Sequence, residues 1–300
     1  MCGTMGPRFR GDDTPKMTRQ HRTPKGVHET PKGVSKSPAT SPTPGSAPDE
    51  PWADLRRLTA ARIALPRSGA SLATAPLLEF RLAHARARDA VHAELDEARL
   101  CADLATLGLP VLAVASAASD RASYLMRPDL GRALAGDAAA PLAAHASSYD
   151  LVIVIADGLS ARAVETHAQP VLALLLPRLA AANWRIAPLV VARHGRVALG
   201  DAVARALGAE IVAVLIGERP GLTAPDSMGA YLSFRPTAQT TDAERNCISN
   251  IRPEGLAYAD AAFKLAHLLA AMRARQISGV ALKDDAERLL IDNPMLPPET

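Results

Sequence analysis

Four short apolar runs, separated by segments of helical character, constrain the fold of this chain more than any other feature. The runs read PVLAVAS, LVIVIA, IAPLVVA and IVAVLIG and cover residues 110–116, 151–156, 186–192 and 211–217. They are rich in β-branched residues and apolar on both faces, which is typical of strands buried on both sides of a sheet. Strands that alternate with helices are joined by right-handed crossovers. The sequence therefore predicts an α/β fold with a parallel sheet and helices on both faces.

Apolar periodicity predicts further elements around these strands. Helices are expected before the first strand and between the strands, over residues 74–92, 94–107, 129–147, 160–182 and 201–207. Two more strands are expected at 231–234 and 247–251, and a long final helix at 255–275. A helical N-terminal segment thus precedes the sheet.

The first 48 residues differ in composition from the rest. They contain eight prolines, many Ser, Thr, Lys and Gly residues, and the near-repeat TPKGVHE/TPKGVSK. A segment of this composition cannot bury enough apolar surface to offset the chain entropy lost on folding. We predict a disordered Pro/Lys-rich tail at 1–48, a helical segment at 49–110 and a sheet domain at 111–300. The tail is either a targeting or tethering segment, or a solvated extension or over-long gene start, with Met5 or Met17 as alternative initiators.

Composition and charge exclude several classes of protein. With 300 residues, of which 48% are hydrophobic, the chain can bury a substantial core and is not intrinsically disordered as a whole. The net charge is +3, but residues 1–48 contribute +5, so the remainder carries −2. No basic stripe follows residue 50 and only 3% of residues are aromatic, so a nucleic-acid partner is not expected.

The sequence also favours a reducing, cytoplasmic compartment. Its apolar runs are far shorter than the roughly 18 residues that suggest a membrane span, and no signal-peptide core follows Met1. The three cysteines, Cys2, Cys101 and Cys247, are widely spaced without a CxxC motif. This spacing argues against a disulfide framework and against a closed zinc site.

The common self-contained catalytic signatures are missing from the sequence. There is no Walker phosphate loop, no G-x-G-x-x-G, no G-x-S-x-G, and no H-x-x-x-H or H-E-x-x-H spacing. Loops that can face a ligand, without a catalytic set of their own, suggest a subunit whose active site is completed by another chain.

Four loops follow the predicted strands, where an open parallel sheet binds its ligands. They are DGLS at 157–160, RHGRV at 193–197, GERPGL at 217–222 and TDAERNCISNIRPE at 241–254. Glu218 needs a partner for its charge, and the alternative to a ligand is an internal ion pair with Arg219 or another cation. Cys247 is either a site residue or a small buried hydrophobic residue. The DGLS loop either contacts a ligand or only caps the next helix.

Several motifs, taken together, resemble one known family. They are DRASYLMRPDLGR at 120–132, ADGLS at 156–160, GRV at 195–197, GERPG at 217–221 and CISNI at 247–251. In order and spacing these motifs are similar to the small (light) subunit of ethanolamine ammonia-lyase. The resemblance covers about residues 55–282, and the joint occurrence of the motifs is highly specific.

This resemblance implies a function that composition alone does not reach. The family's enzyme uses adenosylcobalamin to convert ethanolamine to acetaldehyde and ammonia by a radical mechanism, as a hetero-oligomer of large and small subunits. The large subunit holds the substrate, so no catalytic residue and no metal ligand is expected here. The small subunit has a Rossmann-like fold and helps enclose the corrin, and the family's cofactor contacts fall on Val197, Glu218 and Cys247. The implied compartment is the cytoplasm, with the interior of a bacterial microcompartment as a narrower alternative.

Two further points concern the ligand. Mutases that bind cobalamin through D-x-H-x-x-G replace the nucleotide base on cobalt by His, and this chain lacks that motif; the cofactor is therefore expected to keep its own base. The alternative function is a free-standing α/β phosphate- or nucleotide-binding protein that uses Asp157, Ser160 and a helix N-terminus.

Overall fold

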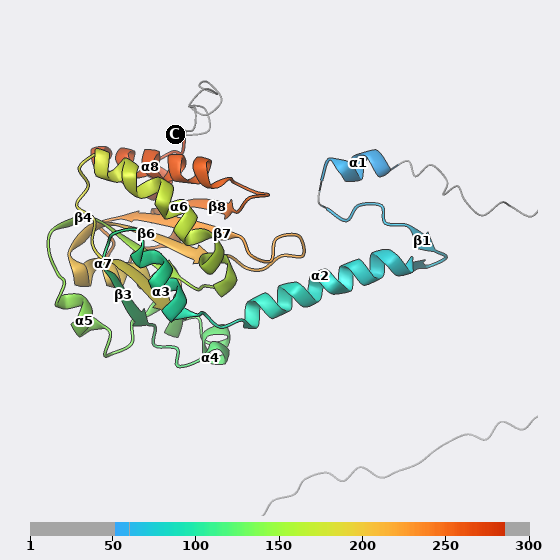
Figure 1. The fold of residues 1–300 in the computed structure, drawn as a ribbon, viewed down its shortest axis with the longest axis horizontal. Coiled ribbons are helices and arrows are strands. Elements are labelled where there is room, and N and C mark those ends of the chain that lie inside the picture. The colour runs from blue at the N-terminus through green and yellow to red at the C-terminus, as the bar shows by residue number, and fades with distance from the viewer. Residues whose placement is uncertain (1–51, 60, 286–300) are drawn as a thin grey trace, which may run out of the picture. The chain divides into compact units, whose positions relative to one another are not determined.

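The computed structural model describes residues 52–59 and 61–285, and its centre is a six-stranded sheet (Figure 1). In spatial order the strands are β3 (Val111–Ala115), β5 (Leu189–Arg193), β4 (Tyr149–Ala156), β6 (Ala209–Gly217), β7 (Met228–Phe234) and β8 (Asn246–Ile251). The first four strands are parallel, as the apolar runs predict. The α/β fold class is thereby confirmed.

The last two strands depart from the parallel arrangement. β7 pairs antiparallel with β6, and β8 pairs antiparallel with β7. The connection over residues 218–227 contains no helix, whereas a return to a parallel neighbour needs a crossover of a dozen or more residues. The sheet is therefore mixed, with a parallel part and an antiparallel edge.

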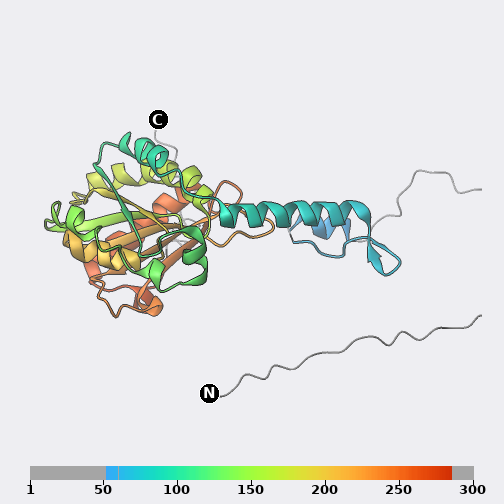
Figure 2. The same ribbon diagram turned by 90° about the horizontal axis from the view of Figure 1, so that it is seen from below.

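Helices cover both faces of the sheet (Figures 1 and 2). Alternate residues of the central strands face opposite ways, so that Ile153 and Leu215 belong to one apolar cluster while Val154 and Val214 belong to the other. The first cluster is covered by α3 (Glu97–Ala105), α6 (Ala161–Ala181) and α8 (Tyr258–Arg275). The second is covered by α5 (Ala139–Ala143) and α7 (Leu199–Leu207). We call the α5/α7 side the second face.

The elements before α3 are less buried. They are α1 (Ala53–Arg57), the two-stranded hairpin of β1 (Arg67–Ser68) and β2 (Ser71–Leu72), and α2 (Thr74–His92). α2 has the bounds predicted from the sequence, but among its residues only Ala87 and Ala90 are buried. The predicted tail over 1–48 lies outside the described residues, and the proposed boundary at 110/111 stays a prediction.

The predicted helix over 129–147 is wrong. The segment instead contains the short helix η1 (Leu130–Arg132) and α5, and it is preceded by α4 (Arg121–Met126). Asp120 starts α4 by accepting a hydrogen bond from the Ser123 amide at 2.8 Å. Pro128 disfavours helical geometry in the residue before it, and Gly131 and Gly136 lower helix propensity beyond it. One long helix is therefore replaced by short pieces.

The other predicted elements agree with the structure to within a few residues. The expected helix over 160–182 is α6, and the helix over 255–275 begins at Tyr258 in α8. The expected strands at 231–234 and 247–251 are parts of β7 and β8. In the part of the chain that the structure describes, no helix combines the length and apolarity needed to cross a bilayer.

Candidate functional site

The three predicted site residues come from different parts of the fold. Val197 follows β5 and precedes α7, Glu218 follows β6, and Cys247 lies within β8. All three lie at the second face: Val197 packs against its apolar cluster, Glu218 lies over Gly229, and Cys247 is paired with Tyr231.

Glu218 is half-buried, and its carboxylate lies across the end of β7. Both carboxylate oxygens are 3.2 Å from the backbone nitrogen of Asn250, which donates to them. Gly229 makes this position available, because a Cβ at Gly229 would lie 2.9 Å from Oε1 of Glu218. The carboxylate occupies space that a side chain on β7 would fill.

The alternative of an ion pair between Glu218 and Arg219 is not what the structure shows. The hydrogen-bond partner of Glu218 is a neutral amide, and Arg219 is exposed. Within the described ranges no ion pair joins the two side chains. A carboxylate has about four acceptor positions, so Glu218 retains capacity for further donors.

Cys247 and Tyr231 are cross-strand neighbours beside Glu218. They are paired in the register of β7 and β8 and therefore share the second face. Burial, together with the nearby Cys247 and Glu218, raises the pKa of Tyr231 to about 12. The Cys247 sulfur lies 3.3 Å from the Ser249 hydroxyl and its side chain is exposed, so the alternative of a buried hydrophobic cysteine is wrong.

Val197 also borders the second face, between β5 and α7. It is half-buried and packs against the apolar cluster that α7 covers. It directly precedes Ala198, the N-cap residue of α7. The loop before it approaches the sheet closely, since a Cβ at Gly195 would lie 3.0 Å from the Cβ of Ala156.

A buried ion pair that sequence reasoning missed fixes α7 to the antiparallel edge. Both terminal nitrogens of Arg245 donate to the two carboxylate oxygens of Asp201 at 2.7 Å, and one also donates to the Ser233 hydroxyl at 3.0 Å. All three side chains are buried. Arg245 stands two residues before Cys247, so the pair sets the position of β8 relative to α7. Nothing in the local sequence distinguishes Arg245 from a surface arginine.

The DGLS loop is used internally. Asp157 and Ser160 are 1% and 0% exposed. The Asp157 carboxylate accepts from the Gly195 amide at 3.0 Å, and the Ser160 hydroxyl donates to the Pro225 carbonyl at 3.2 Å. Ser160 is the N-cap residue of α6 but makes no side-chain cap. The structure therefore gives no support to a phosphate or nucleotide at this helix end.

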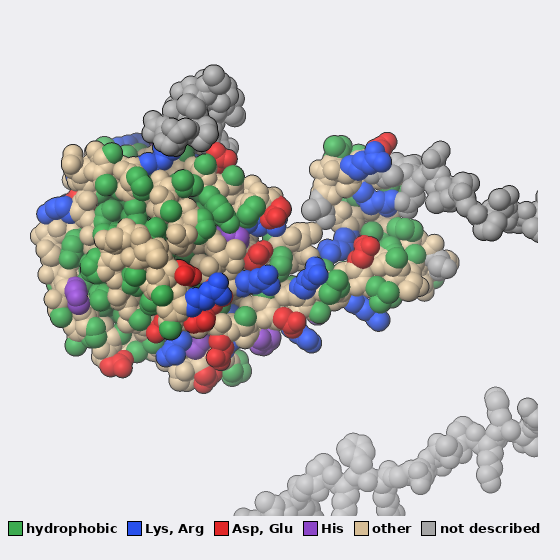
Figure 3. Space-filling model, in the orientation of Figure 1, with side chains coloured by type: hydrophobic (Ala, Val, Ile, Leu, Met, Phe, Trp, Pro, Cys, Tyr) green, Lys and Arg blue, Asp and Glu red, His purple; other side chains and the backbone are tan. Residues whose placement is uncertain are grey.

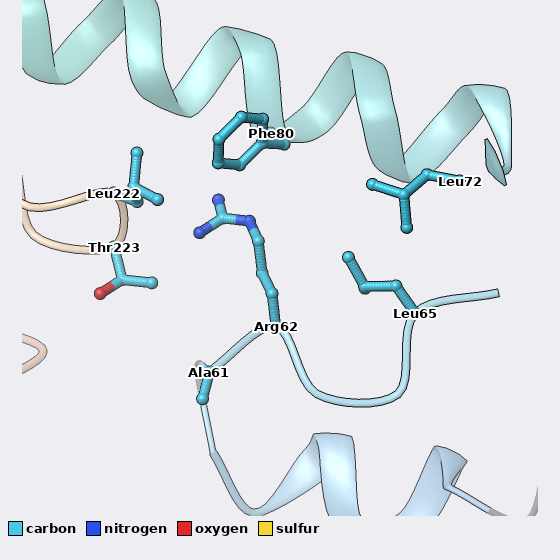
Figure 4. Close-up of a pocket in the computed structure, with 7 residues that line it drawn as sticks. All are labelled: Ala61, Arg62, Leu65, Leu72, Phe80, Leu222 and Thr223. Carbon is cyan, nitrogen blue, oxygen red and sulfur yellow. The ribbon is translucent and has the colours of Figure 1, made fainter. Parts of the chain in front are cut away.

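Two other surface features lie near the loop of Glu218. Figure 4 shows a mostly apolar hollow between the segment that joins α1 to β1, strand β2, α2 and the 218–227 loop, lined by Ala61, Arg62, Leu65, Leu72, Phe80, Leu222 and Thr223. On the face displayed in Figure 3, acidic and basic side chains are interspersed with hydrophobic ones. Among residues 52–59 and 61–285, no three His, Cys, Asp or Glu side chains are placed to hold a metal ion.

The fold and these residues define a class: an α/β protein with a mostly parallel sheet, with Glu218 and Cys247 at its antiparallel edge. The family model for the ethanolamine ammonia-lyase light chain (EutC) matches residues 49–283. The chain belongs to this family.

Relatives from several bacteria support the same assignment. Ethanolamine ammonia-lyase small subunit from Azotobacter vinelandii is 53% identical over 250 residues, which is 82% of this chain and 93% of the relative. The small subunit from Pseudomonas syringae pv. tomato is 51% identical, covering 81% and 86% of the two chains. That from Xanthomonas campestris pv. campestris strain B100 is 53% identical, covering 83% and 93%.

Proposed function

We propose that this small subunit helps enclose adenosylcobalamin at an interface with the large subunit of ethanolamine ammonia-lyase, through Val197, Glu218 and Cys247. The reaction would be the radical conversion of ethanolamine to acetaldehyde and ammonia, with the substrate held by the large subunit. The contacting region would be residues 111–300, and the complex would work in the cytoplasm, with a bacterial microcompartment as a narrower alternative.

The position of Glu218 is the observation that carries this proposal. The rim of a corrin bears amide side chains whose N–H groups need acceptors. The Glu218 carboxylate lies over Gly229 with acceptor capacity beyond the Asn250 amide. A hydrogen bond to a charged acceptor is roughly twice as strong as a neutral one. The residues present therefore fit the group that the family implies.

The remaining residues would shape the surface around that hydrogen bond. Val197 offers an apolar edge next to α7, and Cys247 offers a small exposed side chain on β8. Together they would orient the ring and exclude water from one side of it. When bound, the cofactor supplies the homolysis of its cobalt–carbon bond. The contribution of this chain is enclosure, and the other half of the site would come from the large subunit.

Reconstitution with the large subunit tests the proposal. Deamination of ethanolamine and equilibrium binding of cyanocobalamin should be measured for each subunit alone and for the assembled complex. We expect turnover and tight binding from the complex only. Turnover by the isolated small subunit would contradict the proposal, as would binding by the large subunit alone with the affinity of the complex.

A further inference from the structure

A buried cluster lies behind the loop of Val197 and takes no part in the proposed cofactor contacts. It consists of Arg121 and Tyr124 from α4, Asp157 after β4, and His194 and Arg196 after β5, and we call it the Tyr124 cluster. Arg121, Tyr124, Asp157 and His194 are each at most 6% exposed. Buried charges at such a place need compensating partners.

Arg121 joins three segments that are distant in sequence. Its Nε donates to the Val91 carbonyl at the end of α2 at 2.8 Å. Its Nη1 donates to the Gly158 carbonyl at 2.8 Å and lies 3.4 Å from a carboxylate oxygen of Asp157. Burial raises the pKa of Asp157, and the Arg121 cation opposes this shift. The guanidinium thus holds the DGLS loop against the end of α2.

The ring of Tyr124 lies close to two guanidinium groups. The guanidinium carbons of Arg121 and Arg196 lie 5.0 and 4.6 Å from the centre of its ring. The ring of His194 stacks on it at 5.9 Å between centroids. Burial raises the pKa of Tyr124 to about 12, so the phenol keeps its proton at neutral pH. It donates this proton to the Gly195 carbonyl at 3.3 Å.

Gly195 and Arg196, the two residues before Val197, are fixed by this cluster. The Gly195 amide donates to Asp157 and its carbonyl accepts from Tyr124. The Arg196 amide donates to the Gly131 carbonyl at 2.8 Å, and its side chain donates to the Tyr124 carbonyl at 3.2 Å. A Cβ at Gly131 would lie 3.0 Å from both the Tyr124 ring and the Arg196 side chain, so this glycine permits the close stack.

We infer that Tyr124 and Asp157 are positioning residues that set where Val197 lies, and that Arg121 ties this position to the end of α2. What Val197 touches rests on the proposed function, but the anchoring of its loop does not. Tyr124 and Asp157 each hydrogen-bond to the backbone of Gly195, and the Arg196 side chain returns to the Tyr124 carbonyl. Through these bonds the cluster acts on the loop that carries Val197.

Tyr124→Phe tests this inference with little risk to folding, because the ring and its two cations stay in place. Tyr149→Phe is the matched control: the Tyr149 hydroxyl also donates to a backbone carbonyl, that of His145 at 3.1 Å, at the opposite end of β4. In the assembled complex, four quantities are measured. They are amide hydrogen exchange of residues 194–198, the dissociation constant of cyanocobalamin, and kcat and KM for adenosylcobalamin.

For Tyr124→Phe we expect exchange at 194–198 to accelerate about threefold to tenfold, the range of one lost hydrogen bond. The dissociation constant and KM should rise by a similar factor while kcat at saturating cofactor is retained. Tyr149→Phe should change none of these quantities. Tyr124→Leu, which also removes the ring, should enlarge each effect if it folds.

Unchanged exchange at 194–198 in Tyr124→Phe, or a change equalled by the control, would overturn the inference. Faster exchange with an unchanged dissociation constant and KM would leave the loop anchored by Tyr124 and would instead contradict the proposed cofactor contact of Val197. If the unsubstituted complex binds no cyanocobalamin, the proposed function fails, and the exchange data alone decide whether Tyr124 positions the loop.

Discussion

Because Gly229 has no side chain, the Glu218 carboxylate has room to lie over it. The carboxylate fills the space above the glycine and accepts from the Asn250 amide. Two substitutions at these positions separate a ligand-binding role from a structural one.

Gly229→Ala should displace Glu218 without unfolding the protein. The added methyl would lie 2.9 Å from Oε1, so the carboxylate must move, and the backbone at Gly229 needs no left-handed conformation. We expect cobalamin affinity of the complex to fall by about 1–2 kcal/mol, within the range for hydrogen bonds to charged groups. Gly136→Ala, where a Cβ would meet nothing within 4 Å, is the control. Equal affinities for both variants would argue against the role of Glu218.

Glu218→Gln should weaken cofactor binding more than folding. Gln keeps a carbonyl acceptor but loses the charge, so we expect a loss of about 1–2 kcal/mol in cofactor affinity, seen as a raised apparent KM for adenosylcobalamin. Glu210→Gln is the control, because Glu210 lies at the other end of β6 in an exposed pair with Arg235. Lower thermal stability with unchanged cofactor affinity would instead assign Glu218 a structural role.

At the level of elements, a buried ion pair and a partly buried hydrogen bond join segments that are distant in sequence. The pair of Arg245 and Asp201 joins β8 to α7. The hydrogen bond between His167 and Tyr258, at 2.8 Å, joins α6 to the start of α8. The ion pair supports the second face of the sheet, and the hydrogen bond supports the opposite face.

Asp201→Asn should destabilise the protein by about 3–5 kcal/mol, because it removes the buried counter-charge of Arg245 and leaves only the exposed Asp242, at 3.6 Å. The matched control is Asp129→Asn in the exposed pair with Arg127, where a much smaller loss is expected. Urea unfolding of the two variants measures both quantities. A loss of less than 1 kcal/mol for Asp201→Asn would show that the buried pair contributes little beyond a surface pair.

His167 should make the protein less stable in acid. Burial lowers the pKa of His167 below its usual value of 6.5, although Asp226 opposes the shift. Below about pH 6.5 the unfolded chain therefore binds a proton that the folded chain does not, and stability falls as the pH falls. In His167→Gln the drop in unfolding free energy between pH 7 and pH 5 should be smaller. The exposed His145→Gln should keep the full drop, and equal drops in both variants would contradict the assignment.

The sequence predicts the parallel strands well because burial on both faces leaves a continuous apolar pattern in each run. It does not predict the antiparallel edge, since strand direction depends on a connection rather than on the strand itself. The helix over 129–147 fails because Pro128 and two glycines outweigh the apolar periodicity. Glu218 is noticeable as a charge at a strand end and Cys247 as a thiol in a polar loop, and the family resemblance added Val197. The roles of Gly229, Asp201 and Tyr124 depend on partners far away in sequence, which no local pattern reveals.

At the scale of the whole molecule, the proposed site is one-sided. Val197, Glu218 and Cys247 border one face of the sheet, and Cys247 is exposed in this chain. A cofactor covered on one side only would remain in contact with water, which radical chemistry must exclude. The proposed site therefore needs a second chain over this face.

Hydrogen exchange of the assembled complex with and without cyanocobalamin tests whether this subunit encloses the cofactor. If it does, cofactor binding should slow amide exchange in residues 194–200, 218–231 and 246–251 of this subunit. Exchange at the opposite end of the sheet, around residues 145–150, should not change. Enclosure by this subunit is contradicted if cyanocobalamin binds, protects segments of the large subunit, and leaves exchange in these three segments unaltered.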